Sequence, residues 1–277
     1  MSTQPGVSQS GYLTRVAIIV STWAVQLVRP PSHTYRAEAT RRMARHAVFT
    51  VVAAGALIVV LMIWVDTWEI AQMPPRGTAG LWPFRILTDF GKDTYVLSLA
   101  AILLLAVTLV APAMYGSTRR TLLAIGVRLQ FILLAVAVSL AFGELVKWVA
   151  GRGRPFVGGQ ANAFNFTPFA GTQAHASFPS AHSITAFALA FAIAAIWPRA
   201  RGVMIAYALL IAFTRLVLLA HHPSDVVAGA TIGVIGAMCV RYWFAARDLG
   251  FVIDQAGTIS PAVEAPLKRV AAGPPAP

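Results

Sequence analysis

Long apolar runs, separated by short polar turns, make up most of the chain. Six of these runs are long enough, or nearly so, to cross the hydrocarbon core of a bilayer as helices, which takes about 20 residues. They lie at about 47–65, 94–113, 121–146, 180–197, 203–220 and 224–244. The pattern predicts an all-α fold, a polytopic membrane helical bundle in which six transmembrane helices occupy residues 47–244.

The segments on either side of this bundle have separate predictions. Residues 1–46 are predicted to be cytoplasmic or interfacial, and within them the apolar stretch 16–28 is preceded by Arg15 and stopped by Arg29-Pro30-Pro31. We expect this stretch to form a helix that lies in the cytoplasmic interface. A signal-like segment or a seventh span is the alternative, although no A-x-A-like cleavage site follows. Residues 245–277, which end in Ala-Ala-Gly-Pro-Pro-Ala-Pro, are predicted to be a cytoplasmic, disordered tail.

Composition agrees with a membrane protein. Hydrophobic residues fill 57% of the 277 positions and charged residues 12%, whereas soluble domains carry about 25% charged residues. The formal charge of +12, from 22 basic and 10 acidic residues, would suggest a nucleic-acid partner in a soluble chain. In a membrane protein such an excess mainly orients the spans, so no nucleic-acid partner is expected. The single cysteine, Cys239, excludes an intrachain disulfide and a cysteine-based metal cluster.

The positions of the basic residues predict which ends of the spans are cytoplasmic. Fourteen of them lie before the first run, in the turns at about 114–120 and 198–202, or at the end of the last run and beyond it: Arg15, Arg29, Arg36, Arg41, Arg42, Arg45, Arg119, Arg120, Arg199, Arg201, Arg241, Arg247, Lys268 and Arg269. The bases in the loop at about 66–93 are instead balanced by acids. By the positive-inside rule both termini are cytoplasmic. We expect a multi-pass protein of a bacterial plasma (inner) membrane whose 66–93 loop faces the periplasm or exterior.

Ionisable residues near membrane depth are costly and are therefore functional candidates. Here they gather in three clusters, from Lys147 to Pro155 after the third run, from Phe178 to Ser183 at the start of the fourth, and from Thr214 to Asp225 between the fifth and sixth. The predicted topology, which used none of these residues, puts all three clusters at the outward end of the bundle. The sequence therefore predicts one site at that end.

The residue types in these clusters suit a phosphoryl group. Lys147, Arg154 and Arg215 supply three cations, and the two arginines can grip oxyanions with bidentate geometry. Ser180 is predicted to cap a helix whose free N–H groups form an anion site. Glu144, one turn before Lys147, is expected to pair with that lysine.

Two histidines and an aspartate complete the predicted chemistry. His221 and Asp225 are four residues apart, so on a regular helix the carboxylate can accept the imidazole N–H and fix its tautomer. An imidazole held in this way can act as a nucleophile, and His182 can protonate the leaving oxygen. We expect no metal or other cofactor, even though His175 and His222 lie close in sequence, because three cations in the same site would repel a metal ion.

Taken in order, Lys-x6-Arg-Pro, Pro-Ser-x-His and Arg-x5-His-x3-Asp resemble the three-part signature of the type 2 phosphatidic acid phosphatase superfamily, which also contains vanadium haloperoxidases. The resemblance covers about 140–244 by motif and the first three spans by topology only. Ala181 stands where the family more often has Gly, and Thr214 where it more often has Ser. Neither difference removes a reacting group.

The resemblance implies a role for each of seven residues: phosphate binding by Lys147, Arg154, Ser180 and Arg215, acid catalysis by His182, and a phosphohistidine on His221 with Asp225 as its partner. It further implies a metal-independent lipid phosphatase of the outer membrane face. The candidate substrates are undecaprenyl diphosphate, phosphatidylglycerol phosphate, phosphatidic acid and lipid A 1-phosphate. A lipid-to-lipid phosphotransferase with the same site, a non-catalytic lipid transporter or scramblase, and a vanadate-dependent peroxidase are the alternatives. The sequence predicts no oligomeric state.

Overall fold

A computed structural model describes residues 11–75, 77–159 and 161–262, and this part of the chain is largely helical. Its helices are α1 (Tyr12–Val28), α2 (Arg36–Val60), α3 (Asp66–Gln72), α4 (Trp82–Asp89), α5 (Asp93–Val110), α6 (Gly116–Ala150), α7 (Ala181–Ile196), α8 (Arg201–Val217) and α9 (Pro223–Ala245). A π-helical turn, Leu61–Val65, joins α2 to α3. Two short strands, β1 (Phe251–Ile253) and β2 (Ile259–Pro261), follow α9.

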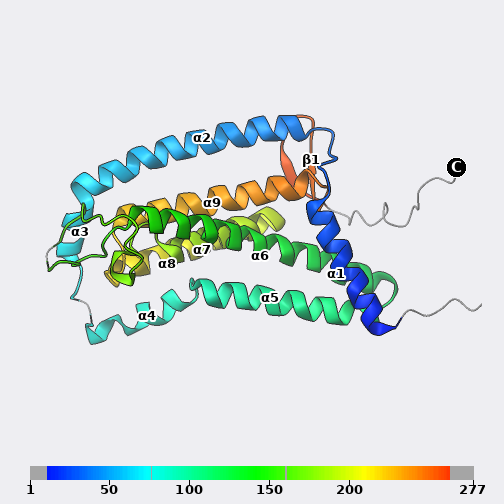
Figure 1. Cartoon of the computed structure of the whole chain (residues 1–277), viewed down its shortest axis with the longest axis horizontal. Helices are drawn as coiled ribbons and strands as arrows, with labels where there is room; N and C mark the ends of the chain where they lie inside the picture. The colour runs from blue at the N-terminus through cyan, green and yellow to red at the C-terminus, as the bar shows by residue number, and fades with distance from the viewer. Residues whose placement is uncertain (1–10, 76, 160, 263–277) are drawn as a thin grey trace, which may run out of the picture.

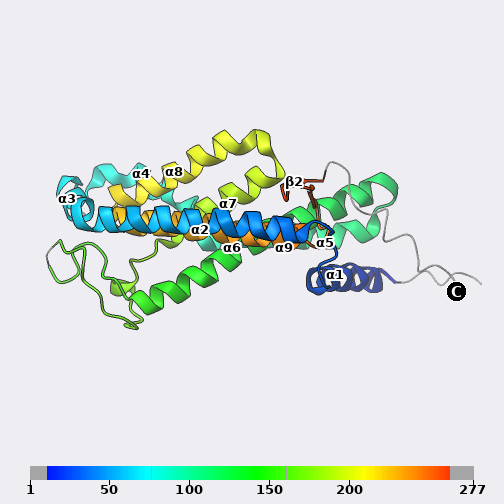
Figure 2. The same cartoon turned by 90° about the horizontal axis from the view of Figure 1, so that it is seen from above.

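The long helices run lengthwise beside one another, while α1 lies across one end of the bundle (Figure 1). Seen from above, α1 is again at that end, and α3 and α4 are at the opposite end (Figure 2). Helix α7 is central because it packs against α6, α8 and α9. Its Ile184, Ala188 and Ala192 are fully buried and form one core with Phe131 of α6 and Phe244 of α9. The α6–α9 group therefore provides the frame on which the loops at its two ends are placed.

Five helical segments are long and apolar enough to cross a membrane, namely Arg36–Gln72, Ala79–Ala113, Gly116–Ala150, Pro198–Val217 and Pro223–Ala245. Each overlaps one of the predicted runs, so the helical structure predicted for those runs is confirmed, although the first two segments begin more than ten residues before the predicted 47–65 and 94–113. The remaining predicted run, 180–197, is the shorter apolar helix α7. Its 16 residues extend about 24 Å, less than the roughly 30 Å of a hydrocarbon core. Helix length alone therefore supports five spans.

Helix α1 confirms that the apolar stretch 16–28 is helical. Its buried Ile19 and Trp23 pack against Ala111, which follows α5. The Trp23 ring also lies against α6, where a Cβ on Gly126 would come within 2.5 Å of it. The choice between an interfacial helix and a seventh span stays a prediction.

The segment that follows α9 differs from the predicted disordered tail. Strands β1 and β2 pair antiparallel, with Phe251 opposite Pro261. Phe251 is buried, and its ring meets the Phe131 ring of α6 with 4.8 Å between centroids. Ile253 is buried as well. The prediction of disorder is thus wrong for residues up to 262, because a short hairpin can be held by apolar contacts with a helix; residues 263–277 lie outside the described residues.

Two glycines four residues apart on α9 allow it to lie close against α7. A Cβ at Gly229 would lie 2.5 Å from the carbonyl oxygen of Ser180, and a Cβ at Gly233 would lie 2.5 Å from that of Ile184. Small residues at this spacing are a common means of close approach between membrane helices. The approach fixes the start of α7, where the Ser180 motif lies, against the first turns of α9.

We predict that Gly233→Ala lowers the thermal stability of the protein, because the added methyl group cannot avoid a backbone carbonyl. Overpacking of this kind costs about 1–3 kcal/mol. Thermal unfolding in detergent measures the effect. Gly55→Ala is the matched control, since a Cβ at Gly55 of α2 has open space around it and alanine favours the helix. Equal unfolding temperatures for the two variants would contradict the tight α7–α9 contact.

Candidate active site

The three sequence motifs meet at one end of the bundle. The end of α6, the start of α7, the end of α8 and the start of α9 all lie there, together with the long loop between α6 and α7 (Figure 1). Ser180 shows how they are joined, since its backbone N–H donates to the carbonyl of Asp225 at 3.1 Å. The Ser180 side chain is buried and its Oγ accepts the Ser183 N–H at 3.5 Å. The predicted helix cap at Ser180 is therefore confirmed.

His221 lies in the turn between α8 and α9 and is 3% exposed. Its Nδ1 is 2.8 Å from the carbonyl oxygen of Ser177 and 3.8 Å from Oδ2 of Asp225. A carbonyl oxygen can only accept a hydrogen bond, so Nδ1 carries the proton and Nε2 keeps its lone pair. The direct acceptor that fixes the tautomer is the Ser177 carbonyl, rather than the Asp225 carboxylate that the sequence analysis predicted.

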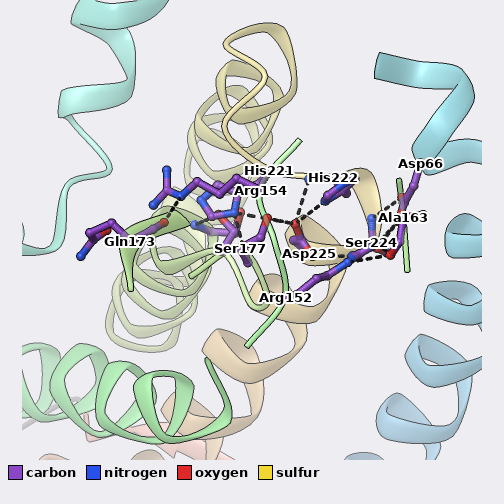
Figure 3. A network of polar contacts seen from close by, with 12 residues as sticks. Asp66, Arg152, Arg154, Ala163, Gln173, Ser177, His221, His222, Ser224 and Asp225 are labelled. Atoms are coloured by element: carbon purple, nitrogen blue, oxygen red, sulfur yellow. Dashed lines mark hydrogen bonds and ion pairs between the residues drawn. The ribbon is translucent and has the colours of Figure 1, made fainter. Parts of the chain in front are cut away.

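Asp225 has other partners, which explains this distance. Its Oδ2 accepts the hydroxyl of Ser177 at 2.6 Å, the backbone N–H of His222 at 2.9 Å and an imidazole contact from His222 Nδ1 at 3.1 Å (Figure 3). His222 is the N-cap of α9, and Asp225 is in the first turn. His222 is thus part of a capping arrangement, and helix α9 begins after His221. The i, i+4 relation in the sequence therefore does not produce the direct hydrogen bond expected on a continuous helix.

The other carboxylate oxygen of Asp225 meets a buried arginine that the sequence analysis did not single out. Arg152 is fully buried, and its Nη1 donates to Asp225 Oδ1 at 2.5 Å. Its Nη2 donates at 2.8 Å to Oδ2 of Asp66, at the start of α3, and its Nε donates at 3.0 Å to the carbonyl of Ala163 (Figure 3). Asp66 also accepts the N–H of Ser224 at 3.0 Å. The cost of acids at membrane depth is the signal that could have pointed to Asp66.

The predicted phosphate-binding cations have distinct surroundings. Arg215 of α8 is 8% exposed, its Nη1 donates to Thr88 Oγ1 of α4 at 2.7 Å, and its Nε has no hydrogen-bond partner within the described chain. The Nε of Arg154 donates to the carbonyl of Gln173 at 3.0 Å. Lys147 contacts Glu144, as predicted.

The charges near His182 include that of Lys92, a loop residue that the sequence analysis did not propose for the site. Arg215, Arg154 and Lys92 all act electrostatically on the imidazole of His182, as does His221. Lys92 lies between α4 and α5, just before the first residue of α5. The structure therefore brings Arg154, Arg215, His182 and His221 together, with Lys92 as an additional cation near them.

The protonation state of His221 follows from its surroundings. Burial lowers the pKa of its imidazole to about 4, and the charges of Arg215 and Arg154 act in the same direction, whereas Asp225 raises it. At neutral pH the imidazole is therefore uncharged, and its Nε2 can donate an electron pair.

No group of three or more His, Cys, Asp or Glu side chains within the described ranges is arranged to hold a metal ion.

Comparison with known proteins is consistent with this geometry. Residues 128–248 match the family model of the PAP2 superfamily. A lipid A 1-phosphatase from Rhizobium johnstonii is 36% identical over 127 residues, which cover 46% of this chain and 52% of the relative. A lipid A 1-phosphatase from Rhizobium etli is 41% identical over 103 residues, which cover 37% and 44% of the two chains. A putative undecaprenyl-diphosphatase, YbjG from Escherichia coli, is 32% identical over 116 residues, which cover 40% and 56%.

The matched segment, residues 128–248, contains all three motifs, so this part of the chain is similar to the PAP2 superfamily. The chain spans about half the length of these curated relatives. With its several long apolar helices, it is a multi-pass membrane protein.

We predict that the buried, neutral His221 makes the protein sensitive to acid. The unfolded chain has an imidazole pKa of about 6.5, above the folded value of about 4. The stability that this group contributes is therefore complete above about pH 6.5 and is lost as the pH falls towards about 4, on the order of 2 kcal/mol by about pH 5. Thermal unfolding of the purified protein over this pH range measures the loss.

His221→Asn provides the control, because asparagine keeps a donor near the Ser177 carbonyl and does not titrate. Its stability should decline less steeply with acid than that of the wild type. Parallel declines in the two proteins would mean that His221 is already charged in the folded state.

Proposed function

We propose that this protein is an integral membrane phosphatase that hydrolyses a phosphomonoester or diphosphate of a membrane lipid through a phosphohistidine on His221. The observation that carries the proposal is the His221 imidazole, whose Nδ1 proton is held by the Ser177 carbonyl at 2.8 Å. Its Nε2 is then available as a nucleophile. The charges of Arg154 and Arg215 act on the same imidazole, so an anionic group at this place would be close to the attacking atom.

In the proposed reaction, Nε2 of His221 attacks phosphorus while the bond from phosphorus to the lipid oxygen breaks. His182 gives a proton to that oxygen, and water then hydrolyses the phosphohistidine. Lys147, Arg154 and Arg215 bind the non-bridging oxygens, and the N-terminus of α7 at Ser180 adds N–H donors. The unsatisfied, buried Nε of Arg215 supports its place among these donors, since a buried donor without a partner is costly. The mechanism uses no metal ion.

We further propose that α7 is the sixth span and that both termini are cytoplasmic. The site lies where α6 and α8 end and where α7 and α9 begin. The arginine-rich turns lie at the other ends of these helices, with Arg119 and Arg120 in the first turns of α6 and Arg199 and Arg201 between α7 and α8. By the positive-inside rule this arrangement supports a site at the outer interface, on the periplasmic side of an inner membrane. A lipid phosphate rests at that depth while its chains stay in the bilayer.

Among lipid phosphates, we propose lipid A 1-phosphate as the first substrate to test and undecaprenyl diphosphate as the second. The two relatives named as lipid A 1-phosphatases support the first, and the putative undecaprenyl-diphosphatase supports the second. Phosphatidylglycerol phosphate and phosphatidic acid complete the panel. A phosphotransferase would use the same phosphohistidine with a lipid acceptor in place of water.

We predict that His221→Ala and His182→Ala each reduce phosphate release about 1,000-fold or more, because each removes a reacting group. Phosphate release from the four lipids by the protein in detergent, with EDTA present, measures the effect. His175→Ala is the matched control, since His175 lies at the same end of the molecule, but its imidazole is hydrogen-bonded to Thr172 and has no role in the proposed reaction. It should keep near wild-type rates.

Three results would count against the proposal. Wild-type rates in His221→Ala would exclude the phosphohistidine, and loss of activity on adding EDTA would exclude a metal-free reaction. Movement of lipids between leaflets without any release of phosphate would favour a transporter or scramblase. Inhibition by vanadate, which mimics the transition state at phosphorus, would support the proposal.

A further inference from the structure

We propose that Asp66, in the first helical turn of α3, is a positioning residue for the reaction and acts on His221 through Arg152, Asp225 and Ser177. This inference rests on the proposed function for its kinetic consequence, whereas its structural basis is independent of the substrate. Asp66 lies outside the segment that matches the PAP2 family, residues 128–248. The proposal therefore assigns a part in the site to the first long helical segment of the chain.

The first step is the ion pair at the start of this chain of contacts. Asp66, Arg152 and Asp225 all have side chains that are 0% exposed. One guanidinium contacts both carboxylates, at 2.8 Å to Asp66 and 2.5 Å to Asp225. On the Nε–Nη2 side of the guanidinium, the acceptors are the Asp66 carboxylate and the Ala163 carbonyl, which together fix its plane. Asp66 is the charged one of these two acceptors and helps to determine where Arg152 can hold Asp225.

The second step ties Asp66 directly to α9. Oδ1 of Asp66 accepts the backbone N–H of Ser224 at 3.0 Å, and Oδ2 accepts the Ser224 hydroxyl at 2.5 Å. Ser224 is 158 residues further along the chain and immediately precedes Asp225. The carboxylate therefore acts as an anion at the N-terminus of α9, where free N–H groups need acceptors.

The third step leads from Asp225 to the imidazole (Figure 3). The Ser177 hydroxyl donates to Asp225 at 2.6 Å, and the Ser177 N–H donates to the carbonyl of Arg152 at 3.0 Å. Ser177 is thus held on both sides by the members of the ion pair. Its own carbonyl accepts the His221 Nδ1 proton at 2.8 Å. A shift in Arg152 or Asp225 would therefore be transmitted to the atom that fixes the tautomer of His221.

Charge adds to this positional effect. Two carboxylates and one guanidinium leave the buried cluster with one net negative charge. Attack by Nε2 makes the imidazole of His221 positive, and a negative charge held nearby stabilises that state more than the neutral ground state. Replacing Asp66 by a neutral residue would remove this net charge. The effect should appear in kcat rather than in KM, because Asp66 does not contact the phosphate-binding arginines among the contacts described.

The experiment compares two acids on the same helix. Asp66→Asn removes the charge that Arg152 contacts. Glu69→Gln is the matched control, since Glu69 is also on α3 and is 5% exposed, but its carboxylate oxygens have no hydrogen-bond partner within the described chain. We expect Asp66→Asn to lower kcat by at least about tenfold with KM changed less than about twofold, and Glu69→Gln to stay near wild type.

A second measurement does not depend on activity. Spectra of the protein labelled with nitrogen-15 in histidine, recorded in detergent, report which imidazole nitrogen carries the proton. The His221 signal is assigned by its absence from His221→Asn. We expect the Nδ1-protonated form in the wild type and in Glu69→Gln, and a loss of this single form in Asp66→Asn. An unchanged His221 signal in Asp66→Asn would overturn the proposal, even if no lipid phosphate proves to be a substrate.

Equal losses of kcat in Asp66→Asn and Glu69→Gln would also overturn it, because α3 would then matter only for folding. Should Asp66→Asn fail to fold, Arg152→Lys takes its place. A lysine keeps the charge but cannot contact two carboxylates with a planar fork. We expect this variant to show the same loss of kcat and the same change in the His221 signal, and full activity with an unchanged signal would overturn the proposal.

Discussion

The buried guanidinium of Arg152 is the constraint on which the site end of the molecule depends. A charge removed from water is tolerated only when its donors are matched by acceptors, and loss of one partner from such a group costs about 3–5 kcal/mol. Arg152 satisfies this requirement with Asp66, Asp225 and the carbonyl of Ala163. The start of α3, the loop after α6 and the start of α9 must therefore meet at one point. Without these contacts of Arg152, the residues around His221 would not be held in fixed positions relative to one another.

The sequence revealed the clusters of the site but not their internal contacts. Lys147, Arg154, Arg215 and the histidines stand out because they interrupt apolar runs at one predicted end. Arg152 lies in the same motif, yet its partner Asp66 is 86 residues away, and no local periodicity connects them. The His221–Asp225 spacing suggested a direct contact, but α9 begins only at Pro223. Helix geometry therefore does not apply to His221, and the nearby Ser177 carbonyl accepts the hydrogen bond from its Nδ1–H.

The fold, like the site, could be predicted where the pattern is local in the sequence, but not where it depends on tertiary contacts. Apolar runs predicted the long helices because burial in lipid demands about 20 apolar residues from each one. They did not predict the hairpin after α9, since strands of three residues are too short for an alternating pattern to be recognised. The hairpin is held by the contact of Phe251 with Phe131. This contact joins two segments that are far apart in the sequence, so the pattern within either segment does not reveal it. Similarly, the short α7 could be judged only once its neighbours were known.

The length of α7 has a consequence for the surrounding lipid. A helix that extends about 24 Å beside longer neighbours leaves the polar start of α7 roughly 6 Å inside a hydrocarbon layer of about 30 Å, if its other end lies at the opposite interface. Such hydrophobic mismatch is relieved when the bilayer thins locally. Local thinning of the bilayer next to Ser180 would bring the lipid headgroups to the depth of the site, so that a lipid phosphate could reach the site without leaving the membrane.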